Sequence, residues 1–152
     1  MRIPALPVIA RDRRGAAAME AALVLPMLTI ALLAVFDIAM GFSAKLKLVQ
    51  AAARTAELAT APATVGSNYG YLVTEAASAS GQPASNVTVA TWLECGGTRQ
   101  ALMTDICGAG QQIARYVSIT IRGTYRSSFG FGAMFRTPNG VAIRGSATVR
   151  LQ

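Results

Sequence analysis

Few residues in this chain could carry out chemistry, and its carboxylates are the first to consider. The 152 residues include seven Asp and Glu and no His. Without histidine, a Ser–His triad and the commonest general base are both missing. Three carboxylates of the C-terminal part, Glu75, Glu94 and Asp105, are far apart in the sequence and form no close pair. We therefore predict that the protein is not an enzyme.

The two cysteines, Cys95 and Cys107, flank a short segment that contains glycine. They lie downstream of a long apolar run, where an exported domain would meet an oxidising compartment. A zinc site would need more ligands than two thiolates. Gly108 and Gly110 form a bare Gly-x-Gly, which lacks the third glycine of a dinucleotide-binding loop. We predict a disulfide between the cysteines, and no metal or other cofactor.

Glu20 is the single charged residue in an apolar run that covers residues 16–36. A charged side chain inside lipid costs about 2.5 to 3.5 kcal/mol on insertion scales, so Glu20 needs a positively charged partner there. In the simpler interpretation it lies near the membrane surface, where water or Arg14 compensates its charge. The residues alone leave both interpretations open.

The apolar run that contains Glu20 predicts a transmembrane helix. At about 1.5 Å per residue it spans about 30 Å, which is the thickness of a bilayer core. Four arginines precede it between residues 2 and 14, opposed only by Asp12. Short basic flanks stay in the cytoplasm, so we expect a single pass with everything after residue 36 on the other side.

Helical character continues beyond the apolar run. No proline occurs between Met27 and Ala61, so one helix is predicted from about residue 16 to 60, with Pro62 as its end. Its apolar side is predicted from side chains spaced by three or four residues: Phe42, Leu46, Val49, Ala53 and Ala56. A shorter helix is predicted before Gly81, with one side formed by Tyr69, Leu72, Val73, Ala76, Ala77 and Ser80.

Beyond Pro83 the apolar period changes from helical to two, which is typical of half-buried antiparallel strands. Strands are predicted at residues 86–93, 117–122 and 141–151, with a turn at 137–140 before the last one. A weaker candidate, 129–135, is interrupted by Gly130 and Gly132. Five aromatic residues of this region are expected to pack in the core rather than line a binding surface: Tyr116, Tyr125, Phe129, Phe131 and Phe135.

These elements predict an α+β protein, in which a long N-terminal transmembrane helix extends into a small C-terminal domain with a short helix and an antiparallel sheet. The predicted division is a basic leader at 1–15, a transmembrane helix at 16–36, a helix extension at 37–61 and a small domain at 62–152. The net charge of +7 comes from the leader and from scattered arginines. No basic cluster interleaved with aromatics is present, so we do not expect nucleic-acid binding.

Three sequence motifs resemble one family. Residues 11–20, RDRRGAAAME, resemble the processing site of type IV pilins, which a prepilin peptidase cuts after the glycine, leaving glutamate as the fifth mature residue. Residues 20–26, EAALVLP, resemble the start of the TadE-like proteins, although the family usually has an aromatic where this chain has Ala21. Residues 47–56, KLVQAAARTA, are similar to a further stretch of that family. TadE-like proteins are minor pilins, or pseudopilins, of tight-adherence (Tad or Flp) pili.

The resemblance implies a type IV pilin-like fold and cleavage after Gly15. The new α-amino group of Ala16 would then pair with Glu20 of a neighbouring subunit and fix the register of helices packed in a filament. The implied partners are other pilins, the prepilin peptidase, the inner-membrane assembly platform and membrane lipid. The implied location is the bacterial inner membrane with a periplasmic domain, and the extracellular pilus after assembly. Because major pilins of this system are much shorter, the C-terminal domain implies a minor, structural or priming subunit.

The main alternative is a periplasmic binding domain, either secreted or membrane-anchored, with an ordinary signal peptide or signal anchor. The basic start of the chain fits this alternative. The apolar run, however, exceeds the usual length of about 7 to 15 residues for a signal peptide. The best cleavage site after it, at residues 39–41, is weak.

Overall fold

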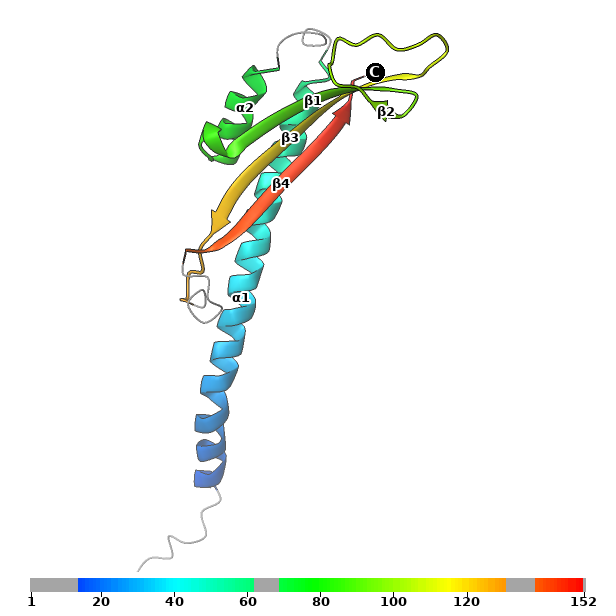
Figure 1. The fold of residues 1–152 in the computed structure, drawn as a ribbon. Helices are drawn as coiled ribbons and strands as arrows, with labels where there is room; N and C mark the ends of the chain where they lie inside the picture. The colour runs from blue at the N-terminus through cyan, green and yellow to red at the C-terminus, as the bar shows by residue number, and fades with distance from the viewer. Residues whose placement is uncertain (1–13, 62–68, 131–138, 152) are drawn as a thin grey trace, which may run out of the picture.

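The structure is a computed structural model that describes residues 14–61, 69–130 and 139–151. A long helix, α1 (Arg14–Leu58), is followed by a short helix, α2 (Tyr71–Ser80), and a 3₁₀ turn, η2 (Ala84–Asn86). The strands are β1 (Val87–Cys95), β2 (Thr98–Arg99), β3 (Ile113–Tyr125) and β4 (Val141–Arg150). Figure 1 shows the sheet and α2 gathered around one half of α1. The predicted α+β class is confirmed.

Helix α1 runs for 45 residues without a break, although Pro26 lies inside it. It consists largely of Ala, Leu, Met and other good helix formers. Its first half projects away from the rest of the molecule (Figure 1), and residues 15–32 are exposed. The prediction of one helix from about residue 16 to 60 is confirmed. Pro62, its predicted end, lies outside the described residues.

The four strands form an antiparallel sheet in the order β2-β1-β3-β4. The three main strand predictions are confirmed, and β3 is longer than predicted. Strand β2 has only two residues, too few to show a period, and the sequence did not predict it. Of the weaker candidate at 129–135, residues 129 and 130 lie in a turn and the rest lie outside the described residues. Residues 137 and 138 of the predicted turn also lie outside the described residues.

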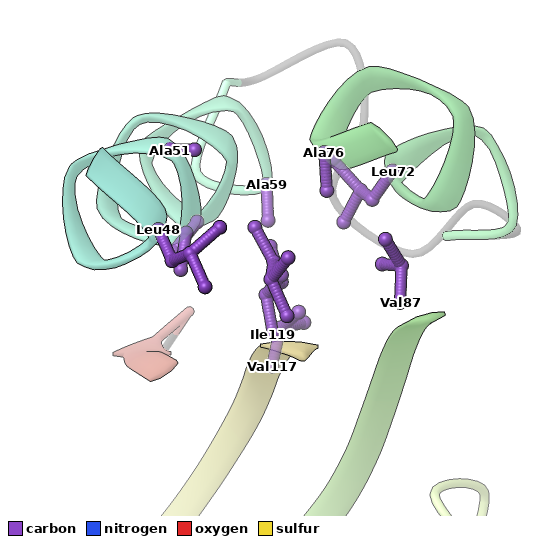
Figure 2. Close-up of a cluster of buried hydrophobic side chains, with 11 residues drawn as sticks. Leu48, Ala51, Ala59, Leu72, Ala76, Val87, Val117 and Ile119 are labelled. Atoms are coloured by element: carbon purple, nitrogen blue, oxygen red, sulfur yellow. The ribbon is translucent and has the colours of Figure 1, made fainter. Parts of the chain in front are cut away.

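The core lies between one face of the sheet and the two helices. Figure 2 shows side chains from α1, α2, β1 and β3 that point toward one another there. Val117, Ile119 and Ile121 of β3 are fully buried, as their alternation predicts. Burying such side chains stabilises the fold by about 1.5 to 3 kcal/mol each. The predicted apolar side of α2 is also confirmed, since Leu72 and Ala76 are fully buried.

The apolar side predicted for the second half of α1 is wrong in part. Phe42 and Leu46 are 62% and 55% exposed. The buried side is instead made mostly of small residues: Leu48, Ala51, Ala52, Thr55, Ala56 and Ala59. The reason is the close approach of helix and sheet, since a Cβ at Gly145 of β4 would overlap backbone atoms of Leu48 and Val49. Small side chains permit this contact, whereas Phe42 and Leu46 do not take part in it.

Candidate functional site

The predicted processing residues lie at the start of α1, away from the C-terminal domain. Gly15, Ala16 and Glu20 are all exposed. A Cβ at Gly15 would meet no atom within 4 Å. No described part of the C-terminal domain therefore covers the bond between Gly15 and Ala16. The proposed roles of these three residues in cleavage and register stay predictions.

The apolar side chains around Glu20 are exposed on every side of the helix. The largest of them are more than half exposed: Met19, Leu23, Val24, Leu25, Met27, Leu28, Ile30, Leu32, Val35 and Phe36. Exposed apolar surfaces of this extent mark contacts with membrane or protein. In the described part of the chain, α1 is the one helix that is long and apolar enough to cross a membrane, judged by length and composition.

A second site lies where the C-terminal domain reaches this apolar segment. The Tyr125 hydroxyl donates to the Asp37 carboxylate (Oη to Oδ1, 2.8 Å) and also lies 3.0 Å from the Asp37 carbonyl oxygen. The Ser128 N–H donates to the same carboxylate oxygen at 3.1 Å. The Ser127 side chain is hydrogen-bonded to Asp37 as well. We call these contacts of Tyr125, Ser127 and Ser128 with Asp37 the Asp37 latch.

The hydrogen bonds of the latch shift the pKa values of its two acidic groups away from neutrality. The pKa of Asp37 is lowered, chiefly by the hydrogen bond with the Ser127 side chain, with burial acting against it and Tyr125 and the Ser128 N–H adding to it. The pKa of Tyr125 is raised, first by burial and then by Asp37. At neutral pH the carboxylate is therefore ionised and the phenol keeps its proton.

Sequence reasoning missed Asp37 as a site residue. Asp37 directly follows the predicted membrane segment and is just 8% exposed. The available signal was a carboxylate directly after the run, without a basic residue nearby. Its partners come from a segment about ninety residues later, which the sequence alone does not place beside it.

An apolar groove lies beside the latch. Its volume is about 350 Å³, and it runs between α1 and the adjoining ends of β3 and β4. It is lined by Asp37, Ile38, Gly41, Phe42, Lys45, Tyr125, Ser127, Gly140, Val141 and Ile143. Next to Asp37 in the sequence, the Phe36 ring meets the Phe129 ring edge-on, with centroids 6.0 Å apart.

The expectation that the aromatic residues pack in the core is wrong for those that the structure describes. Phe129 is 44% exposed, and Tyr125 lies against α1 at Gly41. Tyr116 stacks on Trp92, on the face of the sheet opposite the helices, with centroids 5.2 Å apart. The alternation along β3 already puts Tyr116 on the side opposite Val117 and Ile119, which the helices cover. Phe131 and Phe135 lie outside the described residues.

The predicted disulfide is confirmed. Cys95, at the end of β1, is bonded to Cys107, and their Cα atoms are 5.4 Å apart. The bridge closes a loop that contains β2. In the described ranges, no three Cys, Asp or Glu side chains are grouped so that they could hold a metal ion.

Comparison with known proteins supports the family resemblance. Residues 15–57 match the family model described as TadE-like protein. This range is almost the whole of α1, and it contains Glu20 and Asp37. No curated protein and no solved structure matches the chain significantly. Over residues 15–57, α1 is therefore similar to the TadE-like family, as its motifs predict.

Proposed function

We propose that the protein is a minor pilin, or pseudopilin, of a Tad-type pilus. It is inserted in the inner membrane by α1, trimmed after Gly15 by a prepilin peptidase, and used as a structural or priming subunit in assembly. The observation that carries this proposal is the division of one unbroken helix into two halves. Residues 15–32 are exposed and almost entirely apolar, whereas one side of residues 48–59 is buried under the sheet and α2.

The exposed half needs an apolar environment before and after assembly. Lipid supplies it while the subunit is anchored, and the helices of other pilins supply it in a filament. The alanines that surround Glu20 keep this part of the helix narrow, which favours close approach of a second helix. A rigid connection between anchor and domain also suits a subunit that is lifted from the membrane as one piece.

Glu20 gives this packing a preferred register. After cleavage, the α-amino group of Ala16 would be a positive charge on an apolar helix, and Glu20 of a neighbouring subunit a negative one. Two such charges attract much more strongly in a low dielectric than in water. The exposure of both residues leaves them accessible to a neighbour.

The geometry disfavours the alternative of an ordinary signal peptide. The weak cleavage site at residues 39–41 lies in the middle of α1. A cut there would separate Asp37 from Tyr125 and divide the groove. The surface on which Tyr125 packs, at Gly41, would also become a free chain end. A membrane-anchored binding domain without cleavage remains the second candidate.

The mass of the mature N-terminus tests the proposal. The full chain is produced in a bacterial host with and without a Tad-type prepilin peptidase, extracted from the membrane and measured by mass spectrometry. We expect an N-terminus at Ala16 only when the peptidase is present. An intact Met1 in its presence, or a start beyond residue 35, would contradict the proposal.

A matched pair of variants makes the cleavage test specific. Gly15→Val should abolish processing, whereas Ala18→Val, also in the exposed helix, should be processed normally. A side chain at residue 15 would meet no neighbour. If the Gly15→Val variant is not processed, misfolding of the domain is therefore not the cause.

A further inference from the structure

The Asp37 latch brings the C-terminal domain to the level at which α1 leaves the membrane. On the proposed function, residues 16–36 cross the bilayer, so Phe36 is the last residue in the hydrocarbon layer. The Phe129 ring lies 6.0 Å from the Phe36 ring, centroid to centroid. Phe129 must therefore lie at nearly the same depth. The turn after β3 consequently reaches the outer surface of the bilayer.

The surface presented at this level is apolar. Phe36, Ile38, Phe129 and Val141 are all large apolar residues with 44% to 61% of their surface exposed. Exposed Phe side chains are among those that interfacial segments bury at the boundary between headgroups and acyl chains. The exposed basic residues Lys45 and Arg126 lie on the same two segments, at positions that are farther from the apolar run. A basic rim above an apolar surface is complementary to lipids with anionic headgroups.

The latch also meets a need that arises only at such a boundary. Asp37 follows directly on the predicted membrane segment, where little water is available to solvate a carboxylate. Tyr125, Ser127 and the Ser128 N–H provide hydrogen bonds in place of that water. The same bonds hold the segment that carries Phe129 against α1.

We propose, on the basis of the proposed function, that this foot of the domain binds the outer surface of the inner membrane. The foot consists of Phe36, Ile38, Phe129 and Val141, and its partner is the lipid headgroup layer. Phe129 inserts among the headgroups, and the Asp37 latch holds it there. The domain thus has one fixed height and tilt on the membrane until assembly lifts it away.

Tryptophan fluorescence in nanodiscs tests this proposal. The chain has a single tryptophan, Trp92, which is paired with Tyr116 near the end of the sheet opposite the β3–β4 turn (Figure 1). In the Trp92→Phe, Phe129→Trp variant, we expect lipids brominated near the headgroup to quench at least half of the emission. Lipids brominated at mid-chain should quench it less. The wild-type protein, with Trp92 alone, should show no quenching.

A positive control separates this proposal from the proposed function. A Trp92→Phe, Leu28→Trp variant places the indole near the middle of the predicted membrane segment, so mid-chain bromines should quench it. If they do not, the membrane anchor itself is refuted. If they do, while the Phe129→Trp variant is not quenched by any lipid, the anchor stands and the binding of the foot to lipid is overturned.

A second pair of variants tests the latch. Tyr125→Phe in the Phe129→Trp background removes one hydroxyl and should at least halve the headgroup quenching. Tyr116→Phe, the same change on the opposite face of the sheet, should leave it unchanged. Equal quenching in both would overturn the role of the latch. The indole of the Phe129→Trp variant could instead become buried only when several copies share one disc, with no quenching by lipid. That result would assign the surface to a second copy and refute the proposal.

Discussion

At the scale of residues, two glycines determine how closely the sheet lies on α1. A Cβ at Gly123 would approach the Leu48 side chain to 3.1 Å, and one at Gly145 would overlap the backbone at Leu48 and Val49. Gly145 faces Ile121 across the β3–β4 ladder, and Gly123 is two residues further along β3. The two glycines thus leave a hollow in the sheet, which the helix enters at Leu48.

Gly145→Val should therefore destabilise the C-terminal domain strongly. The added side chain has no space unless helix and sheet separate, and overpacking of this kind costs about 1 to 3 kcal/mol or more. Thermal unfolding of the detergent-solubilised protein, followed by circular dichroism, measures the effect. Ser146→Val is the matched control, because it is exposed on the other face of β4 and valine suits a strand. Equal stability of the two variants would contradict the close approach.

The Asp37 latch predicts a pH dependence with a definite sign. Because the pKa of Asp37 in the folded protein lies below its ordinary value of 3.8, the folded state binds this proton less readily than the unfolded chain. The carboxylate therefore stabilises the fold above that ordinary value, and the contribution is lost as the pH falls through the lower, folded pKa. Asp37→Asn should lower the melting temperature at pH 7, and the difference from wild type should shrink toward pH 2.5. A constant difference over this range would argue against an ionised latch.

At the scale of elements, α1 shows what the sequence could predict and what it could not. Its extent follows from composition and the absence of proline between Met27 and Ala61. The side that it buries does not follow from apolar spacing, because contact with the sheet depends on small residues and on glycines of a strand far along the chain. The Asp37 latch was missed for the same reason. The periodicity of apolar residues locates helices and strands in the sequence. Contacts between distant segments can be identified only once the fold is known.

The loop closed by Cys95 and Cys107 links two elements and should contribute to the stability of the small domain. Closing a loop of this size stabilises by about 2 to 4 kcal/mol in the chain-entropy view, since it restricts the unfolded chain. The double variant Cys95→Ser, Cys107→Ser should therefore unfold at lower denaturant concentration than the oxidised wild type. Adding reductant should lower the midpoint of the wild type and leave that of the double variant unchanged. A wild-type midpoint that does not respond to full reduction would contradict this.

At the scale of the whole molecule, the two halves of α1 differ in burial, and on the proposed function only the exposed half serves as the anchor. The buried half, the sheet and α2 form the core, whereas the exposed half contributes nothing to it (Figures 1 and 2). Substitutions in the exposed half should consequently change assembly without changing the stability of the domain. This separation allows the function of Glu20 to be tested in a folded protein.

Glu20→Ala should impair incorporation into the pilus machinery while the protein remains in the membrane. Removing the carboxylate makes the helix more apolar, so insertion is unchanged or improved. The lost charge leaves the α-amino group of a neighbour without its partner, and helices then pack without a preferred register.

Crosslinking to the other pilins and counting of surface pili measure incorporation, and membrane fractionation measures insertion. Thr29→Ala is a control in the same exposed half, because its hydroxyl donates to the Leu25 carbonyl of its own helix. Normal piliation with Glu20→Ala would refute the role of Glu20, whereas loss of the protein from the membrane would refute the separation of anchorage from assembly.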